Sequence, residues 1–101
     1  LLVKKLISKY YRKNIVYKSP NDLLIEKKKI SGILQETINY NNNKYLIIGI
    51  GVNVIKSPKI NKYPTTNLLD MTKKKLNTKI LADQLKIIFE NKFSKYYRIK
   101  Y

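Results

Sequence analysis

The sequence predicts an α+β fold in which a mixed or antiparallel β-sheet, arranged as a meander, has helices packed on one face. The middle of the chain holds alternating and continuous apolar segments, whereas both ends show the amphipathic spacing of helices. Strands that follow one another directly, instead of alternating with helices, favour this class. Of the 101 residues, 44% are hydrophobic, which is enough for one core in one domain.

The N-terminal segment, from Leu1 to about Lys13, has the pattern of an amphipathic helix. Leu2, Leu6 and Tyr10 recur at four-residue spacing, and lysines occupy the other side. We expect this helix to stop at Asn14.

Short strands and turns follow the first helix. Residues 15–18 have the composition of a strand, and the next four form a turn in which proline fixes φ and Asn and Asp bond neighbouring backbone. Residues 23–25 and 29–39 are predicted strands, separated by a polar turn at 26–28. Alternation along the longer strand predicts one face made of Ile30, Gly32, Leu34 and Glu36, and an opposite face made of Ser31, Ile33, Gln35 and Thr37.

An asparagine cluster, Asn41–Asn43, is typical of a hairpin because asparagine tolerates left-handed backbone. The following run, Tyr45–Val54, is almost continuously apolar. It predicts a central strand that is buried on both faces.

The C-terminal part is predicted to be a loop and then a helix. The loop runs from Ile55 to Asp70 and contains a capped turn at Thr65–Asn67. A helix from about Lys79 to Tyr97, capped by Asn77 or Thr78, would carry one apolar stripe made of Leu81, Leu85, Ile88, Phe89 and Phe93.

The composition excludes several kinds of chemistry. The chain has no histidine and no cysteine, which excludes histidine acid–base catalysis, Ser-His-Asp triads, thiolate nucleophiles and ordinary zinc sites. The carboxylates show no metal-ligand spacing, so we expect no metal ligands in this chain. No apolar run approaches the roughly 18 residues that a membrane span needs, so we expect a soluble, cytoplasmic protein.

The net charge of +16, from 22 Lys and Arg against 6 Asp and Glu, suggests a basic nucleic-acid-binding module as one hypothesis. Nine tyrosines could stack on bases. The lysines are scattered, however, with runs only at residues 27–29 and 73–75. This distribution predicts weak, salt-sensitive binding and no specific recognition of nucleic acid.

Four short segments have unusual sequences at short spacings: Lys18–Asp22, Lys29–Glu36, Ile48–Val54 and Thr65–Leu68. In this order they resemble the catalytic domain of biotin–protein ligases, which has the motifs K-W-P-N-D, K-x-x-G-I-L-x-E, G-x-G-x-N and T-N-L. The resemblance covers about residues 15–69 and implies the class II synthetase-like fold of biotin and lipoate ligases. Ser19 stands where the family usually has Trp, which removes an aromatic packing element but no proposed ligand atom.

Lys18 closes a predicted strand just before the proline turn, at a strand end where sites on β-scaffolds often form. Taken alone, a lysine in so basic a chain is a solvated surface charge. The resemblance implies instead that Lys18 is catalytic: its ammonium would meet the biotin carboxylate and the α-phosphate of ATP and stabilise their negative charge. Leu23 is by pattern a core residue, and the resemblance implies that it also lines the biotin pocket.

Three glycines lie inside predicted strands. Gly32 costs a strand roughly 0.5–1 kcal/mol relative to alanine, which indicates either a bulge or the close approach of a ligand. Gly49 and Gly51 lie two residues apart, on one face, and clear a slot for a flat ligand. By resemblance all three bind biotin, and Asn53 at the end of the slot lies near adenine. This interpretation requires that Lys18 and the slot lie on the same side of the sheet.

Two further residues are assigned to the nucleotide by resemblance. From the pattern, Asn21 is a turn former and Lys29 is an ordinary turn lysine. For Asn21, turn formation and contact with the nucleotide are compatible. Lys29 has an equivalent near the nucleotide in the family.

The resemblance implies an enzyme that makes biotinyl-AMP and pyrophosphate from biotin and ATP, and then transfers biotin to a lysine of a biotin carboxyl carrier protein. ATP use implies Mg²⁺, which would be held mostly by the phosphates. A lipoate–protein ligase of the same fold is the alternative; the G-x-G-x-N strand and the K-x-P-N-D turn favour biotin.

The family also has a loop, G-R-G-R-x-G-R, and a Ser/Thr pair, both preceding K-W-P-N-D. Here the only arginines are Arg12 and Arg98, and the three glycines are those already assigned. We therefore expect residues 1–101 to be the C-terminal portion of a catalytic domain, inactive alone.

Overall fold

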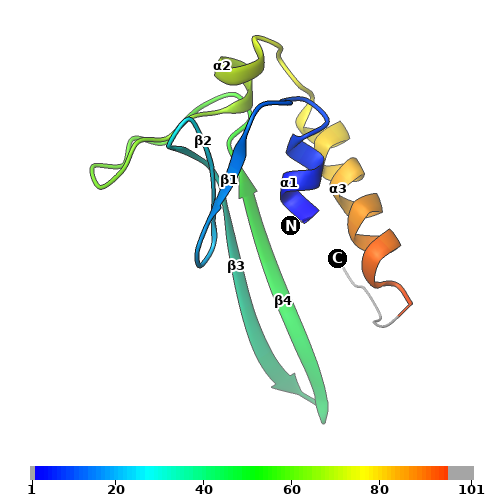
Figure 1. The fold of residues 1–101 in the computed structure, drawn as a ribbon. Coiled ribbons are helices and arrows are strands. Elements are labelled where there is room, and N and C mark those ends of the chain that lie inside the picture. The colour runs from blue at the N-terminus through cyan, green and yellow to red at the C-terminus, as the bar shows by residue number, and fades with distance from the viewer. Residues whose placement is uncertain (1, 96–101) are drawn as a thin grey trace.

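The computed structural model describes residues 2–95, which form a four-stranded antiparallel sheet and flanking helices (Figure 1). The strand order is β1-β2-β3-β4, so consecutive strands are neighbours and the predicted α+β meander is confirmed. The strands are β1 (Ile15–Lys18), β2 (Asp22–Ile25), β3 (Lys28–Tyr40) and β4 (Asn43–Val52), and the helices are α1 (Leu2–Ile7), α2 (Leu68–Thr72) and α3 (Thr78–Phe93). Within residues 2–95, no helix is long and apolar enough to cross a membrane.

One face of the sheet carries the hydrophobic core, where α1 and α3 pack side by side (Figure 1). Apolar side chains from the strands and both helices meet there and exclude water, which is the main stabilising contribution to the fold. The core residues include Val3, Leu6 and Ile7 of α1, Leu81 and Ile88 of α3, and Ile15, Leu23, Ile25 and Ile33 of the strands.

The helix ends follow local capping chemistry. The side-chain oxygen of Asn77 accepts bonds from the backbone N–H groups of Lys79 and Ile80, as the sequence predicts for the start of α3. The helix ends at Phe93, and the predicted end at Tyr97 lies outside the described residues. At the N-terminal end, α1 stops at Ile7 and not near residue 13, because the next backbone bonds tighten to three-residue spacing.

Both two-residue hairpin turns use left-handed backbone. Asn41 and Asn42 have φ values of 49° and 63°, which confirms the predicted asparagine hairpin between β3 and β4. Glu26 and Lys27 have φ values of 50° and 64° and connect β2 to β3. The predicted turn at 26–28 is therefore one residue shorter, since Lys28 pairs with Ile25.

The prediction that Tyr45–Val54 forms a central strand, buried on both faces, is wrong for the described part of the chain. There β4 pairs with β3 alone, at the edge of the sheet, and ends at Val52. The long β3–β4 hairpin extends beyond the helices, and among residues 2–95 nothing packs on either face of its outer half (Figure 1). A continuously apolar segment can be buried on both faces, but whether it is buried depends on which other elements pack against it.

Candidate functional site

A row of four paired residues crosses the whole sheet on the face away from the helices. Lys18 pairs with Asp22, Asp22 with Gly32, and Gly32 with Gly51. Directly opposite residues of antiparallel strands point to the same face. The adjacent row contains Leu23, which is fully buried in the helix-covered core. The predicted slot and Lys18 therefore lie on the same side of the sheet.

A β-bulge at Ile30 determines the direction of Lys29. Leu23 pairs with Ser31, but Leu24 pairs with Lys29, so Ile30 is an extra residue in β3. Because Lys29 is directly opposite Leu24, its side chain lies on the face away from the core. Without the bulge, simple alternation would place Lys29 on the same face as Ser31.

The bulge also corrects one predicted face of β3. Ile30 was expected to share a face with Gly32 and Leu34, but it is 0% exposed and belongs to the core cluster with Ile33. Leu34, in contrast, is 72% exposed. The extra residue reverses the predicted face only for the residues of β3 that precede Ser31. The residues from Ser31 onward lie on the faces that the sequence predicts.

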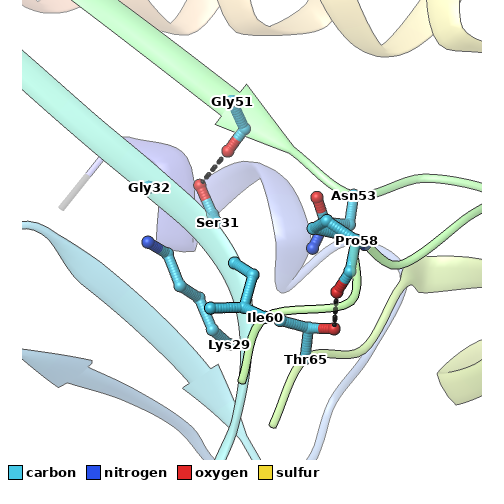
Figure 2. A pocket seen from close by; sticks show the side chains of 8 residues that line it. All are labelled: Lys29, Ser31, Gly32, Gly51, Asn53, Pro58, Ile60 and Thr65. Atoms are coloured by element: carbon cyan, nitrogen blue, oxygen red, sulfur yellow. Dashed lines mark hydrogen bonds between the residues drawn. The ribbon is translucent and has the colours of Figure 1, made fainter. Parts of the chain in front are cut away.

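A pocket of about 200 Å³ opens on this outer face, where β3 and β4 meet the loop that follows β4 (Figure 2). It brings together four of the residues that the sequence singled out: Lys29, Gly32, Gly51 and Asn53. Ser31, Pro58, Ile60 and Thr65 complete its lining. The paired glycines form a floor without side chains, as a flat ligand would require.

The C-terminal part of the loop that lines the pocket is hydrogen-bonded to β3. The backbone N–H of Lys29 donates to the carbonyl of Pro64 at 2.9 Å, and the N–H of Thr66 donates to the carbonyl of Lys29 at 2.8 Å. Asn53 holds the same segment, because its Nδ2 donates to the carbonyl of Thr66 at 3.0 Å. The hydroxyl of Thr65 donates to the carbonyl of Pro58 at 2.7 Å. These bonds fix the position of the loop relative to Lys29.

The ammonium of Lys29 lies between an acid and an aromatic ring. Its Nζ is 3.1 Å from Oδ1 of Asp22 and 3.4 Å from the hydroxyl of Tyr63, whose ring centroid is 5.2 Å away. The hydrogen bond to Asp22 is the main reason that the pKa of Lys29 is raised above its ordinary value of 10.5, against the opposing effect of burial. The side chain is 23% exposed, so a ligand can reach the charge.

The absence of a side chain at Gly32 makes room for this arrangement. A Cβ at this position would lie 3.2 Å from Nζ and 3.3 Å from Cε of Lys29. The absence of a side chain therefore lets the lysine lie across the strand beside the pocket. This geometry explains the strand glycine without any left-handed backbone.

The ion pair gives a pH-dependent contribution to stability. A lysine whose pKa is raised in the folded state stabilises the fold below its unfolded pKa, and that stabilisation is lost as the pH rises through the folded pKa. Asp22→Asn is therefore expected to lower the free energy of unfolding at pH 7 by about 0.5–1 kcal/mol. The difference from the unchanged chain should shrink above pH 10.5. Urea unfolding between pH 7 and 11.5 measures it, and a constant difference across this range would contradict the assignment.

The other predicted site residues lie outside the pocket lining. Lys18 is exposed at the end of β1, and Leu23 is a core residue on the opposite face. The carbonyl of Asn21 accepts the backbone N–H of Ile33 at 2.9 Å, so this residue anchors the turn to β3. Gly49 pairs with Leu34 on the same face as Gly51 and extends the glycine floor along β4.

Tyr63 and four lining residues were not singled out from the sequence. Pro58, Ile60 and Tyr63 belong to the loop, whose path depends on long-range hydrogen bonds. Ser31 carried a weak signal, since its hydroxyl is a polar group inside an apolar strand; it is buried and donates to the carbonyl of Gly51 at 2.7 Å. Among residues 2–95, no group of three or more acidic side chains could hold a metal ion.

The sequence matches a known family of proteins. The biotin/lipoate A/B protein ligase family matches residues 1–53, and the chain belongs to this family.

Solved structures of biotin and lipoate ligases have a similar fold. The biotin protein ligase of Aquifex aeolicus in complex with biotin and ATP has 33% sequence identity and a TM-score of 0.70, with 94% of this chain covered. The biotin protein ligase of Leishmania major in complex with biotinyl-5-AMP has 20% identity, a TM-score of 0.71 and 96% coverage. LipL1 of P. falciparum in complex with lipoate has 14% identity, a TM-score of 0.66 and 99% coverage. The latter two show the fold alone.

The chain spans less than half of each of these relatives. It covers 41% of the Aquifex protein, 45% of the Leishmania protein and 32% of the P. falciparum protein.

Proposed function

We propose that this chain contributes the glycine floor and the cationic group of a site that activates biotin with ATP. The observation that carries the proposal is the pocket in which Gly32, Gly51 and Asn53 meet the ammonium of Lys29. A floor without side chains suits the flat ring system of biotin, and a partly exposed ammonium suits an anion. Family membership supports the reaction class.

In this proposal, Lys29 and not Lys18 is the catalytic lysine. When the biotin carboxylate attacks the α-phosphorus of ATP, a new O–P bond forms and pyrophosphate leaves with the electron pair of the broken O–P bond. Negative charge on the α-phosphoryl oxygens increases during this step, so a fixed ammonium beside them lowers the barrier. Lys29 lines the pocket, whereas Lys18 lies outside its lining.

The nucleotide would lie toward Asn53 and the loop, with biotin toward Gly49. Asn53 lines the pocket and fixes the loop through Thr66. Asn21 is assigned a supporting role, since it anchors the turn that presents Asp22. Mg²⁺, which the use of ATP implies, is assigned no ligand in this chain, because no acidic cluster suits it among residues 2–95.

The second step proposed is transfer to a carrier protein. The amine of a carrier lysine attacks the carbonyl of the mixed anhydride, an amide bond forms, and AMP leaves. A biotin carboxyl carrier protein is the partner that this chemistry requires. We assign no residue of this chain to the contact with the carrier.

Biotin is proposed over lipoate because of the two-glycine strand and the Lys18–Asp22 turn. Lipoate is the second candidate, since the family includes ligases for both acids. Both acids are activated through the same kind of mixed anhydride, so the site chemistry is common to them. The flat cyclic ureide of biotin suits the glycine floor, whereas the dithiolane ring of lipoate is smaller and would cover less of it.

Exchange of labelled pyrophosphate into ATP tests the proposal in the protein that carries this chain. Biotin is expected to support exchange with a kcat/KM at least about tenfold above that of lipoate. The separate polypeptide of residues 1–101 is expected to support none. Exchange with lipoate alone would contradict biotin as the substrate, and exchange with neither acid would contradict the activity.

A further inference from the structure

Tyr63 contacts the ammonium of Lys29 from a loop position that lies outside the four motif segments. Its hydroxyl oxygen is 3.4 Å from Nζ, and its ring centroid is 5.2 Å from Nζ, within the range of a cation–π interaction. Tyr63 is half-buried, and Oδ1 of Asp22 lies 3.1 Å from the same ammonium. Two residues from different parts of the chain thus converge at one charge.

This contact adds a restraint that the ion pair alone does not supply. A lysine side chain is a flexible four-carbon stem, and a single exposed carboxylate leaves it several rotamers. Asp22 attracts the ammonium toward β2, while the ring of Tyr63 covers it on the loop side. The charge is therefore held over Gly32, beside the pocket.

The same loop segment also holds the backbone of Lys29. The carbonyl of Pro64, the residue after Tyr63, accepts the N–H of Lys29 at 2.9 Å. The position of the loop is thereby coupled to both the main chain and the charged end of one residue. A displacement of the loop would move the covering ring away from the ammonium.

We propose that Tyr63 is a positioning residue that fixes the ammonium of Lys29 at the pocket for an anionic acyl-adenylate. The inference deepens the proposed function, on which it rests for the identity of the ligand. The raised pKa of Lys29 is consistent with it, because the hydrogen bond that the ammonium donates to Asp22 contributes most and the one that it donates to Tyr63 acts in the same direction. Tyr63 itself touches no reacting atom in this scheme.

The test separates the hydroxyl from the ring. Tyr63→Phe keeps the ring and removes the hydrogen bond, and Tyr63→Leu removes both. Tyr40→Phe is the matched control, because Tyr40 lies at the far tip of the β3–β4 hairpin and is 64% exposed. Lysine-selective NMR of the protein that carries this chain follows the Lys29 Cε and Nζ signals through a pH titration, without ligand.

Tyr63→Phe is expected to lower the pKa of Lys29, because it removes one stabilising interaction of the charged form. Tyr63→Leu should also shift the Nζ signal toward that of solvated lysines, while the ion pair with Asp22 remains. The affinity for biotinyl-5′-AMP, measured by calorimetry, is expected to fall about threefold to tenfold in Tyr63→Leu and less in Tyr63→Phe. Tyr40→Phe should change neither quantity.

Unchanged Lys29 signals in both Tyr63 variants would overturn the positioning role, whatever the affinity. Altered signals together with full affinity would also overturn it, because the position of the charge would then not matter for the ligand. If Lys29 responds as expected but the unchanged protein binds no biotinyl-5′-AMP, the proposed ligand is wrong and only the structural coupling stands. The two failures are thus distinguishable.

Discussion

Lys29→Gln is expected to lower kcat/KM for biotin-dependent pyrophosphate exchange about 100-fold in the protein that carries this chain. Glutamine keeps most of the length and polarity of the side chain but removes the charge. The loss follows because the ammonium is the charged group that lines the pocket, and fixed charges at developing negative charge contribute most in partly dehydrated sites. Steady-state exchange rates at saturating and limiting biotin give kcat and KM separately.

Lys18→Gln is the matched control for this prediction. Lys18 lies in the same cross-strand row, opposite Asp22, but it is exposed and outside the pocket lining. Its replacement is expected to change kcat/KM by less than about threefold, the scale of a solvated charge. A large loss in Lys18→Gln with a small loss in Lys29→Gln would reverse the two roles and return the catalytic assignment to Lys18.

Gly51→Val is expected to weaken ligand binding strongly without unfolding the chain. A Cβ at Gly51 would have its nearest contact, the carbonyl oxygen of Gly32, at 4.0 Å, so the strand has room for a side chain. Valine also suits a strand, and stability should change by less than about 1 kcal/mol. The methyl groups, however, would occupy the floor of the pocket, and the affinity for biotinyl-5′-AMP should fall at least about tenfold. Calorimetry and thermal unfolding measure the two effects.

Two further variants control this experiment: a smaller substitution at Gly51 and a substitution elsewhere on the same face of β4. Gly51→Ala should give a smaller loss of affinity than Gly51→Val, because it places one methyl group at the floor. Ile47→Val changes a side chain on the same face of β4, paired with Glu36 beyond the pocket, and should leave affinity unchanged. Full affinity in Gly51→Val would show that the ligand does not use this floor.

Local sequence signals predicted most elements of the fold. The asparagine hairpin, the proline turn and the caps at Asn67 and Asn77 each depend on the conformational preferences of a few adjacent residues, and the structure contains all of them. The motif segments likewise contained Gly32, Gly51, Lys29 and Asn53, which line the pocket. Such features can be predicted from the sequence because they depend on residues that are adjacent in the chain.

The apolar run of β4 shows the limit of local signals. Its composition indicates a strand, and β4 is one, but its position at the edge of the described sheet depends on which strands pair with it. The different surroundings of Lys18 and Lys29 have the same origin. Both are lysines near a turn in the sequence, and only the packing around them distinguishes an exposed strand end from a pocket wall.

The sequence by itself determined the order of the four strands and of the first and last helices, though not α2, and it contained the short segments from which the pocket is built. The tertiary structure decided that Lys29 lies on the same face as Lys18 and the glycine floor, because one extra residue at Ile30 changes the register against β2 and turns Lys29 to the outer face. It also brought Tyr63 to that lysine through a loop fixed by bonds to β3. Register and loop position depend on contacts between residues far apart in the chain, and alternation along one strand contains no information about them.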